Sequence, residues 1–200
     1  MPRTFLTLCL LIFVGLFQVR AQKAFEPGYV ISKSFDTLPG LVKDRKEGTF
    51  AKLYKKIRFK GNGVFTKKYS PKQIKGYARG EELFESQWIE VSSRFLKTEY
   101  LSRENFGKRH FLKVRVKGFL SYYQWEWLDQ DSFTVDEMDL FKRRDEDFFI
   151  RVTQGIFGLK MNALEKYFED CPELMEKIRT KELRRPGEIA GFYNDWLEVK

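Results

Sequence analysis

The chain is poor in the residue types that most often build metal sites and catalytic triads. Its 200 residues include one histidine, His110, and two cysteines, Cys9 and Cys171. A structural zinc site needs about four Cys or His ligands, and the nucleophile elbow G-x-S-x-G does not occur in the sequence. We therefore expect no metal site and no cofactor, and we interpret His110 as a packed or surface histidine.

Long apolar runs are equally scarce. The run from Phe5 to Phe17 spans about 13 residues, too short to cross a bilayer comfortably but typical of the core of a secretory signal. Arg3 precedes it, and Val19-Arg20-Ala21 fits a small-x-small cleavage site. We expect residues 1–21 to be a signal peptide that is cleaved between Ala21 and Gln22, with no transmembrane segment left afterwards; the alternative is an uncleaved anchor.

Signal removal would take Cys9 away and leave Cys171 as the one cysteine of the exported chain. An internal disulfide would then be excluded, so the fold must depend on its hydrophobic core. Aromatic residues make up 16% of the sequence and can supply that core. We expect Cys171 to be a small buried residue on the apolar stripe of a helix.

Acidic residues are rare in the N-terminal half. Residues 43–79 contain thirteen Lys or Arg and two acids, a net charge of +11, whereas residues 129–147 contain eight acids and three bases, a net charge of −5. A basic surface attracts phosphates, sulfates, uronic acids or lipid headgroups, and export argues against nucleic acid. The alternative is a solvated, solubilising face. The expected anion-binding residues are Lys52, Lys55, Lys56, Arg58, Lys60, Lys67, Lys68, Lys72 and Lys75.

Two hairpins are predicted in this half. Residues 28–42 read as two strands around a turn, with Pro39 indicating an edge or a bulge. Ile57 and Phe59 alternate with bases, so these bases should share the opposite, exposed face of a strand. Gly61-Asn62-Gly63 is expected to supply the positive φ angles of a tight turn, followed by a return strand over residues 64–68.

Later strands and a helical tail complete the expected α+β fold. Strands are expected at residues 74–78, 83–91, 95–100 and 119–128, whereas residues 111–116 fit either a strand or a short helix. Pro172 and Pro186 are placed to begin helices. We predict an N-terminal antiparallel β roll or half-barrel of about six to eight strands, followed by two or three C-terminal helices. The expected division is a signal at 1–21, a β-rich domain at 22–157, and a helical segment at 158–200 packed on the same domain.

Two further groups invite a functional interpretation. An aromatic row, expected to be core rather than a sugar-stacking platform, consists of Phe119, Tyr123, Trp125 and Trp127. An acidic group could suggest calcium, but it fails the EF-hand pattern and is interpreted as an acidic loop; it consists of Asp129, Asp131, Asp136, Glu137 and Asp139.

Several short stretches, taken in order, resemble a largely uncharacterised family of exported proteins of the Bacteroidota. They are Gly28-Tyr29-Val30-Ile31, Asp36-Thr37-Leu38, Tyr69-Ser70-Pro71, Gly118 with Leu120 and Tyr122-Tyr123, Asp170-Cys171-Pro172, and Tyr193-Asn194. Phe35 departs from the pattern, because a glycine is common before Asp-Thr. The resemblance implies a Gram-negative envelope location, in the periplasm or on the outer surface, and it implies no catalytic residues.

Three functional hypotheses remain at this point. The first is a non-enzymatic domain that binds another envelope protein or an envelope component. The second is recognition of an anionic glycan, envelope polymer or lipid headgroup through a basic sheet face. The third and weakest is a carboxylate-based hydrolase, which rests only on the abundance of Asp and Glu.

Overall fold

The computed structural model describes residues 25–46, 52–94, 97–129, 131–132, 134–155 and 158–200. The expected signal segment, with Cys9, Ala21 and Gln22, lies outside these residues. The described part contains eleven strands followed by three helices, which is the predicted α+β order. No helix in the described part is long and apolar enough to cross a membrane.

Six antiparallel strands close into a barrel. Their order is β6-β7-β11-β10-β9-β8, and β8 pairs again with β6. We expected a roll or half-barrel of about six to eight strands. The observed sheet is larger, because six strands form a closed barrel and five more extend it. The barrel strands are β6 (Glu82–Arg94), β7 (Lys97–Leu101), β8 (Lys108–Val116), β9 (Leu120–Leu128), β10 (Val135–Arg143) and β11 (Phe148–Arg151).

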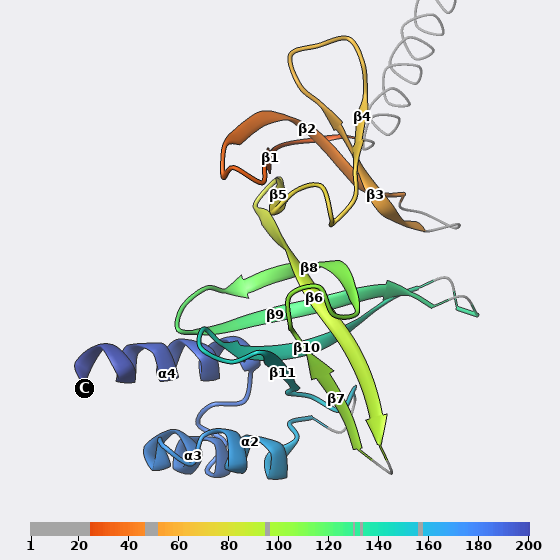
Figure 1. Cartoon of the computed structure of the whole chain (residues 1–200). Helices are drawn as coiled ribbons and strands as arrows, with labels where there is room; N and C mark the ends of the chain where they lie inside the picture. Colours follow the sequence, from red (N-terminus) through yellow and green to blue (C-terminus); the bar gives the residue numbers. More distant parts are fainter. Residues whose placement is uncertain (1–24, 47–51, 95–96, 130, 133, 156–157) are drawn as a thin grey trace, which may run out of the picture.

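The other five strands form an N-terminal sheet that continues from the same long strand β6 (Figure 1). Residues 82–85 of β6 pair with β5, and residues 90–94 pair with β7 along the same edge. One strand thus belongs to both the sheet and the barrel. The strands of the N-terminal sheet are β1 (Glu26–Ile31), β2 (Thr37–Lys46), β3 (Lys52–Lys60), β4 (Lys67–Tyr69) and β5 (Gly76–Arg79).

The helices pack against the outside of the barrel and share a core with it. They are α2 (Met161–Tyr167), α3 (Pro172–Arg179) and α4 (Pro186–Val199), so both prolines begin helices as predicted. Leu120 and Phe141 of the barrel are fully buried against helix residues such as Leu174. Cys171 is also fully buried, but it is the N-cap of α3 rather than a residue within a helix.

Asn194 of α4 fastens this helix to the barrel. Its side-chain oxygen accepts a hydrogen bond from the Leu120 amide at 2.8 Å, and its nitrogen donates to the Leu120 carbonyl at 3.0 Å. Gly118 is needed beside this contact, because a Cβ there would lie 2.3 Å from the Asn194 nitrogen. The neighbouring Tyr193 hydroxyl donates to Asp170 at 2.6 Å. These residues therefore hold the helices on the barrel.

The expectation of an acidic loop is wrong for three of its five acids. Asp136, Glu137 and Asp139 lie in strand β10, where Glu137 and Asp139 alternate with Met138 and Leu140, which pack inside the barrel. The high charge of this stretch conceals an alternating pattern. Residues 111–116, which fitted either a strand or a helix, belong to strand β8.

The turn predicted at Gly61-Asn62-Gly63 is also wrong. None of these residues has a positive φ, and the return strand is only β4, so residues 61–66 form a longer loop. A left-handed residue occurs instead in the β1–β2 turn, where Phe35 has a φ of 69°. A glycine would adopt this conformation without the steric penalty that a side chain brings.

We predict that Asn194→Ala lowers the free energy of unfolding by about 2 kcal/mol, because it removes two hydrogen bonds and leaves the Leu120 backbone groups unsatisfied. Urea unfolding measures the change. Asn162→Ala, on the exposed face of α2, is the control and should stay within about 0.5 kcal/mol of the parent. Equal effects of the two substitutions would contradict the role assigned to Asn194.

Candidate anion-binding surface

Strand β3 carries its apolar and basic residues on opposite faces. Ile57 and Phe59 are buried at 0% and 4% exposure, and they pack with Val30 and Val42 in the core of the N-terminal sheet. Arg58 lies between them and Lys60 follows, so both point away from that core. The alternation seen in the sequence therefore produces an outward basic face, as expected.

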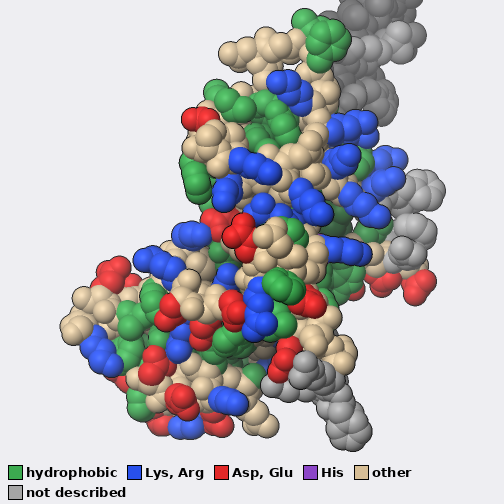
Figure 2. Space-filling view, in the orientation of Figure 1, with side chains coloured by type: hydrophobic (Ala, Val, Ile, Leu, Met, Phe, Trp, Pro, Cys, Tyr) green, Lys and Arg blue, Asp and Glu red, His purple; other side chains and the backbone are tan. Residues whose placement is uncertain are grey.

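Cations lie directly opposite one another on three neighbouring strands. Lys43 of β2 pairs with Arg58 of β3, and Arg58 pairs with Lys68 of β4. Residues that face each other in this way have Cβ atoms about 4.5–5.5 Å apart, and like charges there are destabilising. We define the basic face as the five residues Lys43, Lys56, Arg58, Lys60 and Lys68. Figure 2 shows Lys and Arg side chains gathered over the N-terminal sheet.

No acid neutralises the basic face within the described part of the chain. None of its five cations forms an ion pair there, although Arg45 and Arg79 of the same sheet both do. Three of them instead lie over aromatic rings: Arg58 is 4.4 Å from the Tyr54 ring centroid, and Lys60 and Lys43 are 4.4 Å and 6.0 Å from that of Phe25. The face therefore combines unpaired positive charge with flat apolar groups.

The nine cations predicted to bind anions do not all share this face. Lys55 lies on the opposite side of β3, and Lys67 pairs with Phe59, which places it on that side too. Lys72 and Lys75 lie in the turn between β4 and β5, where Lys75 is 5.0 Å from the Phe35 ring centroid. Lys52 lies beyond the register shift, opposite Lys46, and the remaining four belong to the basic face. Lys43 was missed, although its position beside the apolar Val42 would have indicated an outward residue.

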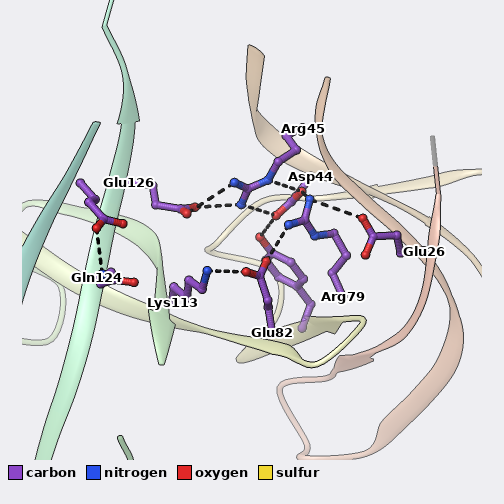
Figure 3. A network of polar contacts seen from close by, with 10 residues as sticks. Glu26, Asp44, Arg45, Arg79, Glu82, Lys113, Gln124 and Glu126 are labelled. Atoms are coloured by element: carbon purple, nitrogen blue, oxygen red, sulfur yellow. Dashed lines mark hydrogen bonds and ion pairs between the residues drawn. The ribbon is translucent and has the colours of Figure 1, made fainter. Parts of the chain in front are cut away.

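Beneath the basic face, a buried carboxylate joins β2 to β5 (Figure 3). Asp44 is 4% exposed. It accepts hydrogen bonds from the Tyr77 hydroxyl and from an Arg79 guanidinium nitrogen, both at 2.8 Å, and from Arg45 Nε at 3.1 Å. Burial raises the pKa of Tyr77, and the negative charge of Asp44 raises it further. The sequence offered no signal for this cluster, because its members come together only through the strand register.

The same cluster connects the N-terminal sheet to the barrel. Arg45 donates to Glu126 of β9 at 2.8 Å. Arg79 donates to Glu82 of β6 at 2.6 Å, and Lys113 of β8 pairs with the same carboxylate. We call these residues, with Asp44 and Tyr77, the polar junction. Its cations Arg45, Arg79 and Lys113 are paired with carboxylates, whereas within the described residues those of the basic face are not.

Three rings of the predicted aromatic row, Tyr123, Trp125 and Trp127, alternate along one face of β9, and Phe119 precedes the strand. Tyr123 is 3% exposed and lies inside the barrel, where Trp125 also packs, 4.8 Å from His110 between ring centroids. Phe119 packs instead against the helix-side core, and Trp127 is 39% exposed. The four rings therefore belong to different surroundings. Burial lowers the pKa of His110, and Lys108 lowers it further.

The acids of β9 and β10 are held by internal bonds. Glu126 and Glu137 lie directly opposite each other. Gln124 donates to Glu137 at 3.0 Å and to Asp139 at 3.3 Å, and Asp139 also accepts from Tyr122 at 2.5 Å. Burial raises the pKa of Glu137, and Asp139 and Glu126 raise it further. Among the described residues, no group of three His, Cys, Asp or Glu is placed to hold a metal ion.

Comparisons with known proteins return no relative of this fold and surface. No protein-family model matches the chain, and no curated protein and no solved structure matches it either.

We predict that Asp44→Ala lowers the free energy of unfolding by about 3–5 kcal/mol, because it leaves the guanidinium groups of Arg45 and Arg79 buried without their shared carboxylate. Chemical denaturation followed by circular dichroism provides the measurement. Asp195→Ala, at an exposed position on α4, is the control. A loss for Asp44→Ala of less than about 1 kcal/mol would show that the junction does not depend on this carboxylate.

We predict that Glu137→Gln raises the free energy of unfolding near neutral pH by about 0.5 kcal/mol, because it removes a charge directly opposite Glu126. The raised pKa of Glu137 makes its ionised form unfavourable in the folded state. The gain should therefore disappear as the pH falls below the ordinary glutamate pKa of 4.5, where both states are protonated. Urea unfolding across this pH range tests the sign, with the exposed Glu81→Gln as control. A gain that persists in acid would refute the electrostatic cause.

Proposed function

We propose that the protein is a non-enzymatic binding domain of a Gram-negative cell envelope, and that its basic face binds an anionic envelope component. The ligand chemistry is a phosphate, sulfate or carboxylate carried by a polymer or by a lipid headgroup. The observation that carries this proposal is the row Lys43–Arg58–Lys68, three cations opposite one another without an ion-pair partner in the described part of the chain.

Such a row lowers the stability of the free protein. Cross-strand like charges repel, and nearby Arg45 and Arg79 are placed against carboxylates in the same sheet. An anion lying across three strands would supply the missing negative charge to all three cations at once. A purely solubilising role would not require the cations to be aligned in register.

The rings that lie within this face support the same proposal. Tyr54 and Phe25 hold Arg58 and Lys60 over their faces, and this contact restricts the freedom of two long side chains. Side chains that are already ordered lose less entropy when they bind a ligand. The setting in an envelope rests on the expected signal segment and on the family resemblance of the sequence.

A hydrolase is not favoured by a comparable observation. Glu126, an acid of the polar junction, is bonded to Arg45. Asp139 accepts hydrogen bonds from Tyr122, Gln124 and Thr153. Carboxylates held in this way connect strands and sheets, so binding rather than catalysis is the function that we propose.

We predict that Arg58→Gln with Lys68→Gln weakens binding to an anionic polysaccharide by about tenfold or more, because each charge near an anionic surface contributes about 1 kcal/mol. Dextran sulfate and neutral dextran serve as probes, and binding is titrated with salt. The control pair Arg144→Gln with Lys166→Gln changes the same residue types at exposed positions far from the sheet and should bind like the parent.

A second measurement on the same residues separates a binding role from a structural one. Lys68→Gln alone should raise the free energy of unfolding by about 0.5 kcal/mol at low ionic strength, because the repulsion from Arg58 is removed, and added salt should reduce this gain. Binding to dextran sulfate that is absent, independent of salt, or equal in the two double variants would refute the proposed function.

A further inference from the structure

We infer that the β3–β4 loop, residues 61–66, inserts into the surface of an anionic lipid bilayer, so that lipid headgroups are the anions that the basic face binds. This inference rests on the proposed function and specifies its ligand. It is carried by two observations: apolar residues at the tip of the loop, and unpaired lysines at its base.

The tip of the loop presents two large apolar side chains to solvent. Val64 is 93% exposed and Phe65 is 84% exposed. The strand predicted over residues 64–68 would have turned one of them inward, but β4 begins only at Lys67. Burying a Val or Phe side chain is favourable by about 1.5–3 kcal/mol, so their exposure on a hairpin tip indicates a surface that covers them.

Lysines lie at both ends of the loop, next to this tip. Lys60 ends β3, and Lys67 and Lys68 begin β4. None of the three forms an ion pair within the part of the chain that the structure describes. In Figure 2, hydrophobic side chains lie at the upper end of the N-terminal sheet and basic side chains lie below them.

The apolar tip followed by lysines matches the layers of a bilayer surface, in which the acyl chains are followed by the headgroup phosphates. An apolar group buried about 5–10 Å into the boundary between headgroups and acyl chains leaves the residues next to it at the level of the headgroups. Lysine stems can lie along apolar surface while their ammonium groups reach phosphate. With Val64 and Phe65 in the acyl region, Lys60, Lys67 and Lys68 would meet the anionic phosphates.

A soluble anionic polymer fits the same surface less well. It would neutralise Lys60 and Lys68, but it offers no apolar region to cover Val64 together with Phe65. A bilayer supplies both the negative charge and the apolar region. The basic face then extends the contact from the loop across β3 towards β2, because Arg58 and Lys60 lie on one face of one strand.

The inference is tested by co-sedimentation of the chain beginning at Gln22, which contains all of the contacts described above. The vesicles are phosphatidylcholine alone and phosphatidylcholine with about one third phosphatidylglycerol. We expect binding to the anionic vesicles only, and we expect Val64→Ser with Phe65→Ser to reduce the partition coefficient by about tenfold or more. Both side chains are exposed, so this variant should unfold at the same temperature as the parent.

A matched control changes the same residue types elsewhere. Phe106→Ser with Val199→Ser alters an exposed Phe and an exposed Val, 56% and 89% exposed, outside the N-terminal sheet. This control should bind anionic vesicles like the parent. If it loses as much binding as the loop variant, or if the loop variant binds normally, insertion of the loop is refuted.

Dextran sulfate separates failure of this inference from failure of the proposed function. Loss of vesicle binding by Val64→Ser with Phe65→Ser, while dextran sulfate binding is unchanged, supports insertion of the loop. Binding to dextran sulfate without binding to anionic vesicles overturns the bilayer inference and leaves the proposed function intact. Binding to neither probe overturns both.

A fluorescent label gives an independent readout of depth. Cys171 is fully buried, so a cysteine introduced by Val64→Cys can be labelled selectively with an environment-sensitive dye. Its emission should shift to shorter wavelength when anionic vesicles are added, because the tip enters a less polar medium. A label introduced by Val199→Cys should show no shift, and equal emission of the bound and free loop label would refute insertion.

Discussion

The buried carboxylate of Asp44 is the constraint on which the arrangement of the molecule depends. It takes hydrogen bonds from Tyr77, Arg79 and Arg45, and Arg45 extends this cluster to Glu126 of the barrel. Burying a carboxylate at that depth without such partners would cost several kcal/mol, about the penalty of an unpaired buried charge. The N-terminal sheet is therefore fixed on the barrel by a set of charges that stabilise one another only when all of them are in place.

The same cluster explains why the outer surface is so basic. The pairing of β2 with β3 shifts its register between Lys43 and Arg45, and Arg45 therefore lies opposite Leu53 rather than opposite a cation. Arg45 points into the polar junction, whereas Lys43 lies opposite Arg58 on the outer side. The nearby carboxylates are all engaged in the junction, because Asp44, Glu82 and Glu126 form ion pairs with its cations. No acid of the junction is left to neutralise the basic face.

Short patterns in the sequence predicted the features that depend on neighbouring residues alone, namely helix starts and strand alternation. Pro172 and Pro186 mark the starts of helices because proline suits the first turn, and Ile57 with Phe59 alternates because one side of β3 is buried. Closure of the barrel could not be predicted, since it depends on pairing β6 with β8 across the chain. Strand β10 was missed because its outward residues are acidic, and the loop tip was missed because Val64 and Phe65 resemble strand residues.

The two proposals meet at Lys60 and Lys68, which belong to the basic face and also stand at the base of the β3–β4 loop. If these cations served solubility alone, nothing would favour placing Lys68 directly opposite Arg58, where the repulsion lowers the stability of the sheet. The exposed Val and Phe beside these cations are also unfavourable in water, just as the charge repulsion is. Charge repulsion and apolar exposure are relieved together at one kind of surface, an anionic bilayer, and this coincidence on a single hairpin is the argument that joins the fold to its proposed function.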